Sequence, residues 1–140
     1  MRTIFLLALP LLAAACQPAE APASSGGTAA AAMAAADLAG EWRIASVDGA
    51  SVDQPEAITA TITASRIDVQ SGCIRFAYDY QLDGGALTTT NAPVASCRRG
   101  LTPAEQSVQQ AFAGATQVAR MPGNGVQFTG GGRSVTLFSQ

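Results

Sequence analysis

The candidate chemistry of this chain lies in its cysteine, carboxylate and arginine side chains. The 140 residues contain no histidine, and all 8 basic residues are arginines. Without histidine there is no imidazole base, no histidine metal ligand and no histidine pH switch. Without lysine there is no Schiff-base chemistry. The net charge of −2 argues against binding to nucleic acid, whose phosphate backbone attracts basic proteins.

Cys73 and Cys97 are two of the 3 cysteines, and an oxidising compartment would favour a disulfide between them. A metal site and a catalytic thiol are the alternatives. Two cysteines without histidine make a poor zinc site. A nucleophilic cysteine needs a neighbouring base, and the sequence offers no obvious one. We therefore expect a structural disulfide, no metal and no cofactor.

Asp79, Asp83 and Glu105 are acids that lie close to this cysteine pair in the sequence. A pair of carboxylates can perform general acid–base catalysis, as in a small hydrolase. Asp83 precedes two glycines in a predicted turn, where aspartate is favoured by local hydrogen bonds. Glu105 stands where it would complete a helix cap. Because both acids have structural roles, we expect the protein not to be an enzyme.

Arg98 and Arg99 follow Cys97 and form the only basic pair in the sequence. Such a pair can contact anionic lipid head groups or an acidic protein partner. The alternative is a solvated loop after a strand, with no ligand. The pair is the candidate partner contact of the chain.

Residues 1–15 read as an export signal. Arg2 supplies a positive charge, Ile4–Leu12 is an uncharged apolar run, and three alanines precede Cys16. The apolar run is shorter than the roughly 20 residues that span a bilayer. The stretch Leu12–Cys16 resembles the bacterial lipobox, in which the cysteine receives lipid and becomes the mature N-terminus.

Lipidation of Cys16 would leave an even pair of cysteines, whereas a secreted chain with three would keep one unpaired. Ala13 and Ala15 also fit ordinary signal cleavage, which would release a soluble periplasmic protein. We expect a lipid anchor at Cys16. Gln17 is not the aspartate that retains some lipoproteins in the inner membrane, so the expected location is the outer membrane, facing the periplasm.

Residues 16–36 are predicted to form a lipidated cysteine and a disordered tether. The segment is rich in alanine, proline, serine and glycine, and Met33 is its only large apolar residue. Such a composition buries too little surface to offset the entropy of ordering. One domain is then expected over residues 37–140.

Alternating apolar residues predict antiparallel strands in this domain. Glycine-rich turns separate them, and Asp83–Gly85 predicts a hairpin. The alternation is found at Trp42 and Ile44, 58–62, 67–69, 74–80, 126–128 and 135–137, and residues 86–90 are expected to form the second strand of the hairpin. Tyr78 and Tyr80 share one strand face and are expected in the core. The pattern indicates a mainly β (α+β) fold.

One segment has helical signals instead. Thr102 can cap a helix, Pro103 suits its first position, and Glu105 completes a capping box. Val108 and Phe112 share a face, and Gly114 can end the helix in the left-handed conformation. The sequence therefore predicts a small antiparallel β-barrel-like domain with one covering helix.

The order of these features resembles the META domain of HslJ-type bacterial lipoproteins. It runs from Leu38-x-Gly40-x-Trp42 through Gly72-Cys73, the strand ending at Tyr80, and Cys97 to the helix that Glu105 opens. The resemblance implies a small β-rich barrel with a helix, often exported and lipid-anchored, without enzymatic activity. It also implies a loose link to envelope stress and antibiotic tolerance. Ile74 and Tyr78 stand where the family has Asn and Gly.

Two function classes follow. The first is a non-catalytic envelope lipoprotein that binds or scaffolds an envelope protein partner. The second is a periplasmic lysozyme-inhibitor-type module, for which Ala95–Arg99 would have to supply the inhibitory loop, although an arginine pair has the wrong sign for basic lysozyme. The expected protein is a monomer that is attached to the membrane through lipid on Cys16.

Overall fold

The computed structural model describes residues 33–140. The predicted signal segment, Cys16 and most of the predicted tether lie outside the described residues. The elements are α1 (Ala35–Leu38), β1 (Gly40–Val47), β2 (Ala50–Ser51), β3 (Thr59–Ile62), β4 (Arg66–Ser71), β5 (Ile74–Asp83), β6 (Ala86–Ala92), α2 (Pro103–Ala113), β7 (Gln117–Met121), β8 (Gly125–Gly130) and β9 (Arg133–Ser139).

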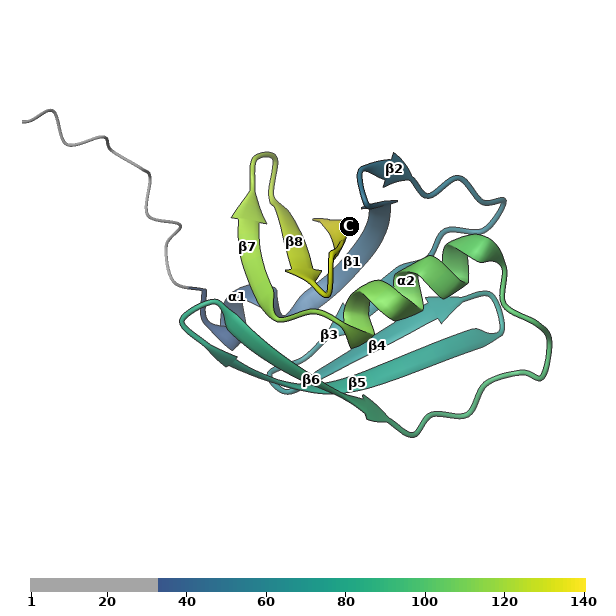
Figure 1. Cartoon of the computed structure of the whole chain (residues 1–140), viewed down its shortest axis with the longest axis horizontal. Helices are drawn as coiled ribbons and strands as arrows, with labels where there is room; N and C mark the ends of the chain where they lie inside the picture. The colour runs from purple at the N-terminus through teal and green to yellow at the C-terminus, as the bar shows by residue number, and fades with distance from the viewer. Residues whose placement is uncertain (1–32) are drawn as a thin grey trace, which may run out of the picture.

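The strands form a closed antiparallel barrel (Figure 1). The order β1-β3-β4-β5-β6-β7-β8-β9 returns to its start because β1 also pairs with β9. The short strand β2 folds back on the end of β1 and stands outside this ring. The predicted fold class, a mainly β barrel with a covering helix, is confirmed.

Turn chemistry sets the strand register. The predicted hairpin at Asp83 is present, with Asp83 opposite Ala86. Gly84 and Gly85 both have positive φ angles, 57° and 95°, which match the twist of a two-residue hairpin. Antiparallel neighbours with such short connections account for most of the ring.

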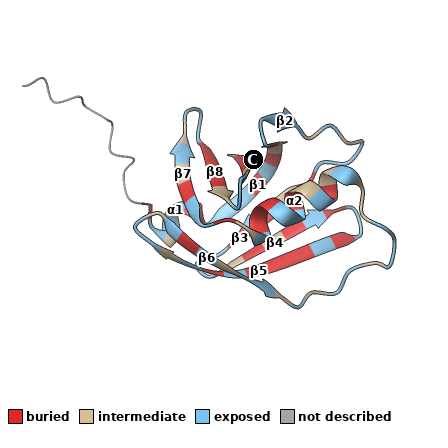
Figure 2. Cartoon of the chain, in the orientation of Figure 1, coloured by how far each residue is buried: buried red, intermediate tan, exposed pale blue. Residues whose placement is uncertain are grey.

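Buried residues alternate with more exposed ones along β3 and β4 and over much of β5 (Figure 2). β5 is the longest strand, and Tyr78 and Tyr80 are buried as predicted. The ring of Phe112 on α2 lies between Tyr78, at 5.8 Å between centroids, and Phe128 on β8, at 5.3 Å. These aromatic contacts join the helix to opposite sides of the barrel.

α2 confirms the predicted covering helix. Thr102 and Glu105 form the capping box, and Pro103 opens the first turn. Val108 and Phe112 face the barrel and are fully buried. The helix packs between β5 and β6 on one side and β1, β8 and β9 on the other. The predicted left-handed end at Gly114 is wrong: its φ is −96°, and its N–H closes a bond to Gln110 O instead.

The ordered domain begins before the predicted boundary at Asp37. Met33 is buried, and α1 packs Leu38 into the core. The indole Nε1 of Trp42 donates a 2.7 Å hydrogen bond to Leu38 O, which fixes α1 on β1. The last residues of the predicted tether, 33–36, therefore belong to the domain, because one methionine and one leucine are enough to dock this turn.

The joint between β6 and β7 is the narrowest in the ring. One residue pair, Ala86 with Gln117, and two flanking backbone bonds connect the strands. The sequence did not predict β7, because Val118 is its one buried residue and no alternation is visible. Neither helix in residues 33–140 has the length and apolar character needed to cross a membrane.

Candidate functional site

The predicted disulfide between Cys73 and Cys97 is confirmed, with 5.6 Å between the Cα atoms. Cys73 lies in the two-residue turn between β4 and β5, and Cys97 lies in the connection from β6 to α2. A backbone bond from Cys97 N to Cys73 O, 3.2 Å long, runs beside the disulfide. The bridge therefore ties an irregular connection to the start of the longest strand.

Glu105 is fully buried on α2 and forms an ion pair with Arg99. Its Oε1 and Oε2 accept hydrogen bonds of 2.6 and 2.8 Å from the guanidinium of Arg99, and Oε2 also accepts one from Thr102 N. The Arg99 hydrogen bonds, helped by Ser71 and Thr102 and opposed by burial, lower the pKa of Glu105 to about 2. The same bond with Glu105 raises the pKa of Arg99. Glu105 stays ionised as a structural anion.

The predicted basic pair is divided by the fold. Arg99 turns toward Glu105 and also approaches Ser71 O, so its charge is neutralised within the domain. Arg98 is exposed and forms no salt bridge within residues 33–140. The two arginines therefore do not present one joint basic patch, a separation that their adjacent positions in the sequence do not reveal.

The three candidate acids do not form one site. Asp79 is exposed on β5 and pairs with Arg66 at 3.5 Å. Asp83 ends the same strand at the hairpin, about 13 Å further along at the usual rise per residue. Glu105 is buried on α2. Within residues 33–140 no three metal-ligating side chains come together.

The connection after β6 forms a second feature that the sequence did not predict. We call residues Pro93–Cys97 the strap, which runs beside β5 to the disulfide. Arg66 donates to Pro93 O at 3.4 Å, and the amide of Arg75 donates to Ser96 Oγ at 3.0 Å. With the disulfide, these contacts fix an irregular segment at both ends.

Two hollows flank the strap on the outer surface. One, of about 350 Å³, lies between the strap, Asn91 and Gln109 of α2. The other, of about 330 Å³, lies over β3, β4 and β5, and Val94 forms one wall. Arg75 lines both hollows. Glu41 and Asp68 line the second, so opposite charges face the same space.

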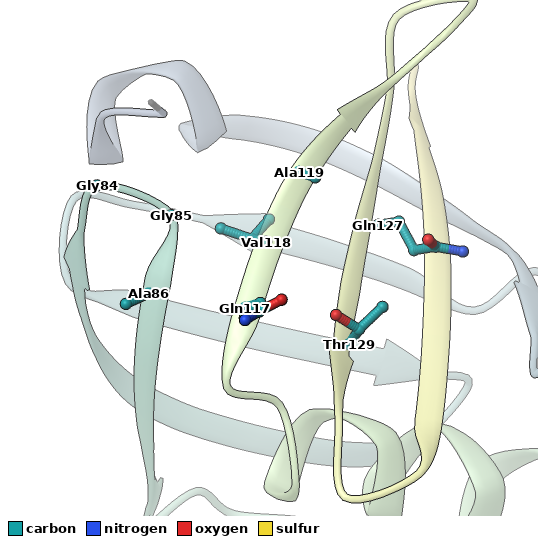
Figure 3. A pocket seen from close by; sticks show the side chains of 8 residues that line it. All are labelled: Gly84, Gly85, Ala86, Gln117, Val118, Ala119, Gln127 and Thr129. Carbon is teal, nitrogen blue, oxygen red and sulfur yellow. The ribbon is translucent and has the colours of Figure 1, made fainter. Parts of the chain in front are cut away.

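A third hollow, of about 430 Å³, lies at the narrow joint between β6 and β7 (Figure 3). Figure 3 shows Gln117, Gln127 and Thr129 on β7 and β8, beside the Gly84–Gly85 turn. The lining is neutral and built from small or amide side chains. We call the strap and the two hollows beside it the strap surface. Because charged side chains line the strap surface, it can recognise a ligand more selectively than the neutral third hollow can.

Comparison with solved structures gives the fold. The chain is similar to a protein from Burkholderia xenovorans whose structure was determined by NMR. The TM-score is 0.50 at 20% identity, and the match covers 72% of this chain and 81% of that one. A search of curated proteins finds no match.

The sequence model of the META domain matches residues 36–140, which include the whole barrel, the disulfide and α2. The match begins one residue from the predicted boundary and covers most of the chain. The chain belongs to the META domain family.

Proposed function

We propose that this META domain protein is a non-catalytic binding or scaffolding module of the bacterial envelope. Lipid on Cys16 would hold it at the outer membrane, facing the periplasm, with a role in envelope stress or antibiotic tolerance. The lipobox-like sequence before Cys16 supports the anchor. An anchor raises the effective concentration of a domain near one surface, which suits a binding role.

The observation that carries the proposal is the strap surface. Hydrogen bonds from Arg66 and Arg75 and the Cys73–Cys97 bridge hold the strap beside β5. A segment fixed in advance loses less conformational entropy when a partner binds. The charged side chains beside the strap, Glu41, Asp68 and Arg75, line an open hollow on the surface, where a partner can contact them.

The contacts of the acids support the non-catalytic part of the proposal. Glu105 is ion-paired and caps α2, and Asp79 shares Arg66 with Asp68. General acid–base catalysis needs a titrating group within reach of a substrate proton. A buried carboxylate that remains ionised to about pH 2 is unsuited to that task.

Complementation of a deletion strain tests the proposal. The wild-type chain and the variant Asp79→Ala should both restore envelope tolerance, whereas Arg75→Gln should not. Arg98→Gln is the matched control, since Arg98 is an exposed arginine away from both strap hollows. Each variant is checked for folding by circular dichroism.

Affinity capture with the anchored full chain should recover an envelope partner that is lost with Arg75→Gln and kept with Arg98→Gln. A well-folded Asp79→Ala protein that fails to complement, together with turnover of an envelope substrate by the wild type, would replace the binding role with a hydrolytic one.

A further inference from the structure

We propose that the hollow over β3, β4 and β5, which Glu41, Arg75 and Val94 line, binds a short peptide through the two free ends of that peptide. The peptide carboxylate would contact Arg75, and its ammonium group would contact Glu41. The inference rests on the proposed binding role and names the chemistry that its surface recognises.

The strand register places these groups in two neighbouring rows on the outer face. Arg75 lies opposite Gln70, Gln70 opposite Thr59, and Thr59 opposite Arg43. The next row contains Glu41, Thr61 and Asp68. Arg43 and Arg75 thus lie at the two ends of the first row, and Glu41 and Asp68 lie in the second row, on neighbouring strands of the same sheet.

Arg75 forms no ion pair with Glu41 or Asp68, the two acids that line the same hollow. The guanidinium of Arg75 makes no salt bridge within residues 33–140, and only its backbone amide is engaged, by Ser96. Glu41 accepts one hydrogen bond from the Thr61 hydroxyl, 3.0 Å long. Asp68 is already paired with Arg66. The free cation and the free anion therefore stand on opposite sides of one hollow.

The spacing selects a ligand longer than a single amino acid. Glu41 and Arg75 are three strand spacings and one two-residue step apart, about 16 Å between Cα atoms. Both side chains line the same hollow, so their charged ends can lie closer together than the Cα atoms do. An extended dipeptide, at about 3.5 Å per residue, can place one charged end near each of them, whereas the two charges of a single amino acid are too close together.

Three neighbouring groups complete the complementarity. Val94 gives an apolar wall for a small side chain. The Gln70 amide N–H already donates to Gly72 O and the Thr61 hydroxyl to Glu41, so their oxygens remain as acceptors for the N–H of the peptide bond. The strap is fixed to β5, so Val94 does not have to be ordered on binding. The neutral hollow at the β6–β7 joint has no group that would distinguish charged ends from blocked ones.

Titration of the purified full chain with Ala-Ala, followed by amide chemical shifts in NMR, tests the site. We expect shifts at the strap and on β4 and β5, with a dissociation constant of about 1 mM. N-acetylated and C-amidated Ala-Ala should each bind at least about tenfold more weakly, because each loses one charge-assisted contact. Free alanine, with its charges closer together, should also bind more weakly.

Two variants locate the contacts. Arg75→Gln should weaken Ala-Ala binding and remove the effect of amidation, and Glu41→Gln should remove the effect of acetylation. Arg98→Gln should bind as the wild type does. Equal binding of free and doubly blocked Ala-Ala, no shift at the strap, or wild-type binding by Arg75→Gln would overturn the inference. Complementation by the chain is read in cells, so the proposed function can stand if this site fails.

Discussion

Glu105 shows how one buried charge organises the start of α2. It is the one fully buried charged side chain in residues 33–140, and Arg99 supplies its counter-ion from the connection after the disulfide. The same carboxylate accepts from Thr102 N and so completes the helix cap. The pair therefore links the helix start to the chain that follows Cys97.

The helix cap could be predicted from local sequence, because Thr102 and Glu105 are three residues apart. The ion pair could not, since Arg98 and Arg99 are chemically alike and only the path of the chain decides which one turns inward. Arg75 was missed for a similar reason. Its proposed role depends on Glu41, which three strand pairings bring to the same face.

Replacement of Arg99 by glutamine should lower the free energy of unfolding more than replacement of Arg98 does, because it leaves the fully buried carboxylate of Glu105 without its counter-ion. Solvent screening at the partly exposed guanidinium of Arg99 limits the size of this loss. Urea denaturation measures the difference. Arg98→Gln is the control and should change stability by less than about 0.5 kcal/mol. Equal effects of the two substitutions would contradict the assignment of the pair.

Lowering the pH should reduce the free energy of unfolding by the contribution of the ionised Glu105 carboxylate. The pKa of Glu105 is lowered from 4.5 to about 2 in the folded state, so its contribution is complete above about pH 5. The contribution is lost as pH falls through the range between 4.5 and about 2, and it amounts to about 3 kcal/mol at most. Denaturation curves of the wild type and Glu105→Gln should therefore converge toward pH 2. A constant difference from pH 7 to pH 2 would show that Glu105 is not paired as described.

At the scale of the elements, close backbone approach fixes the junction of α2, β7 and β8. Gly130 has a φ of 155°, and a Cβ atom there would clash with Gly114 O and lie 2.5 Å from Thr116 N. Thr116 N also donates to Thr129 O across this junction. The glycine-rich run at 130–132 predicted a turn, but it did not show which glycine is required by packing.

Gly130→Ala should therefore be severely destabilising, by more than about 3 kcal/mol, because the obstacles are backbone atoms that cannot move aside. Gly132→Ala provides the matched control in the same turn. Gly132 has a φ of 76° and open space around its Cβ position, so only the left-handed conformation is penalised, by about 1–2 kcal/mol. Thermal denaturation of both variants decides the point, and a larger loss in Gly132→Ala would refute it.

The disulfide also connects two elements, since it joins the strap to the turn that leads into β5. Replacement of Cys73 and Cys97 by alanine should lower the free energy of unfolding by about 2–4 kcal/mol, through the freedom gained by the unfolded chain. Amide hydrogen exchange should accelerate at position 97 and at Arg75 while the strands on the far side of the barrel stay protected. Unchanged exchange in the strap would mean that its hydrogen bonds hold it without the bridge.

At the scale of the whole molecule, the strand patterns and turns predicted the barrel well. Alternation along β5 and the Gly84–Gly85 hairpin are local signals, so they are visible in the sequence. The closure of β1 on β9, the weak joint at β7 and the docking of α1 depend on contacts between distant segments. Met33 illustrates this limit, because its low-complexity surroundings hid a buried side chain.

The proposed anchor gives the prediction for the complete protein. Mass spectrometry of the mature chain should find Cys16 as an acylated N-terminal residue, and the protein should fractionate with the outer membrane. The chemical reason is the small-residue run before Cys16, together with the commitment of the other two cysteines to a disulfide. Cys16→Ser is the matched control, because it removes the thiol that accepts lipid and leaves Ala13 and Ala15 for ordinary cleavage. It should release a soluble, folded domain with the Cys73–Cys97 bridge intact. An unmodified Cys16 on a soluble wild-type chain would refute the anchor, and the effective concentration that it gives the strap surface would be lost with it.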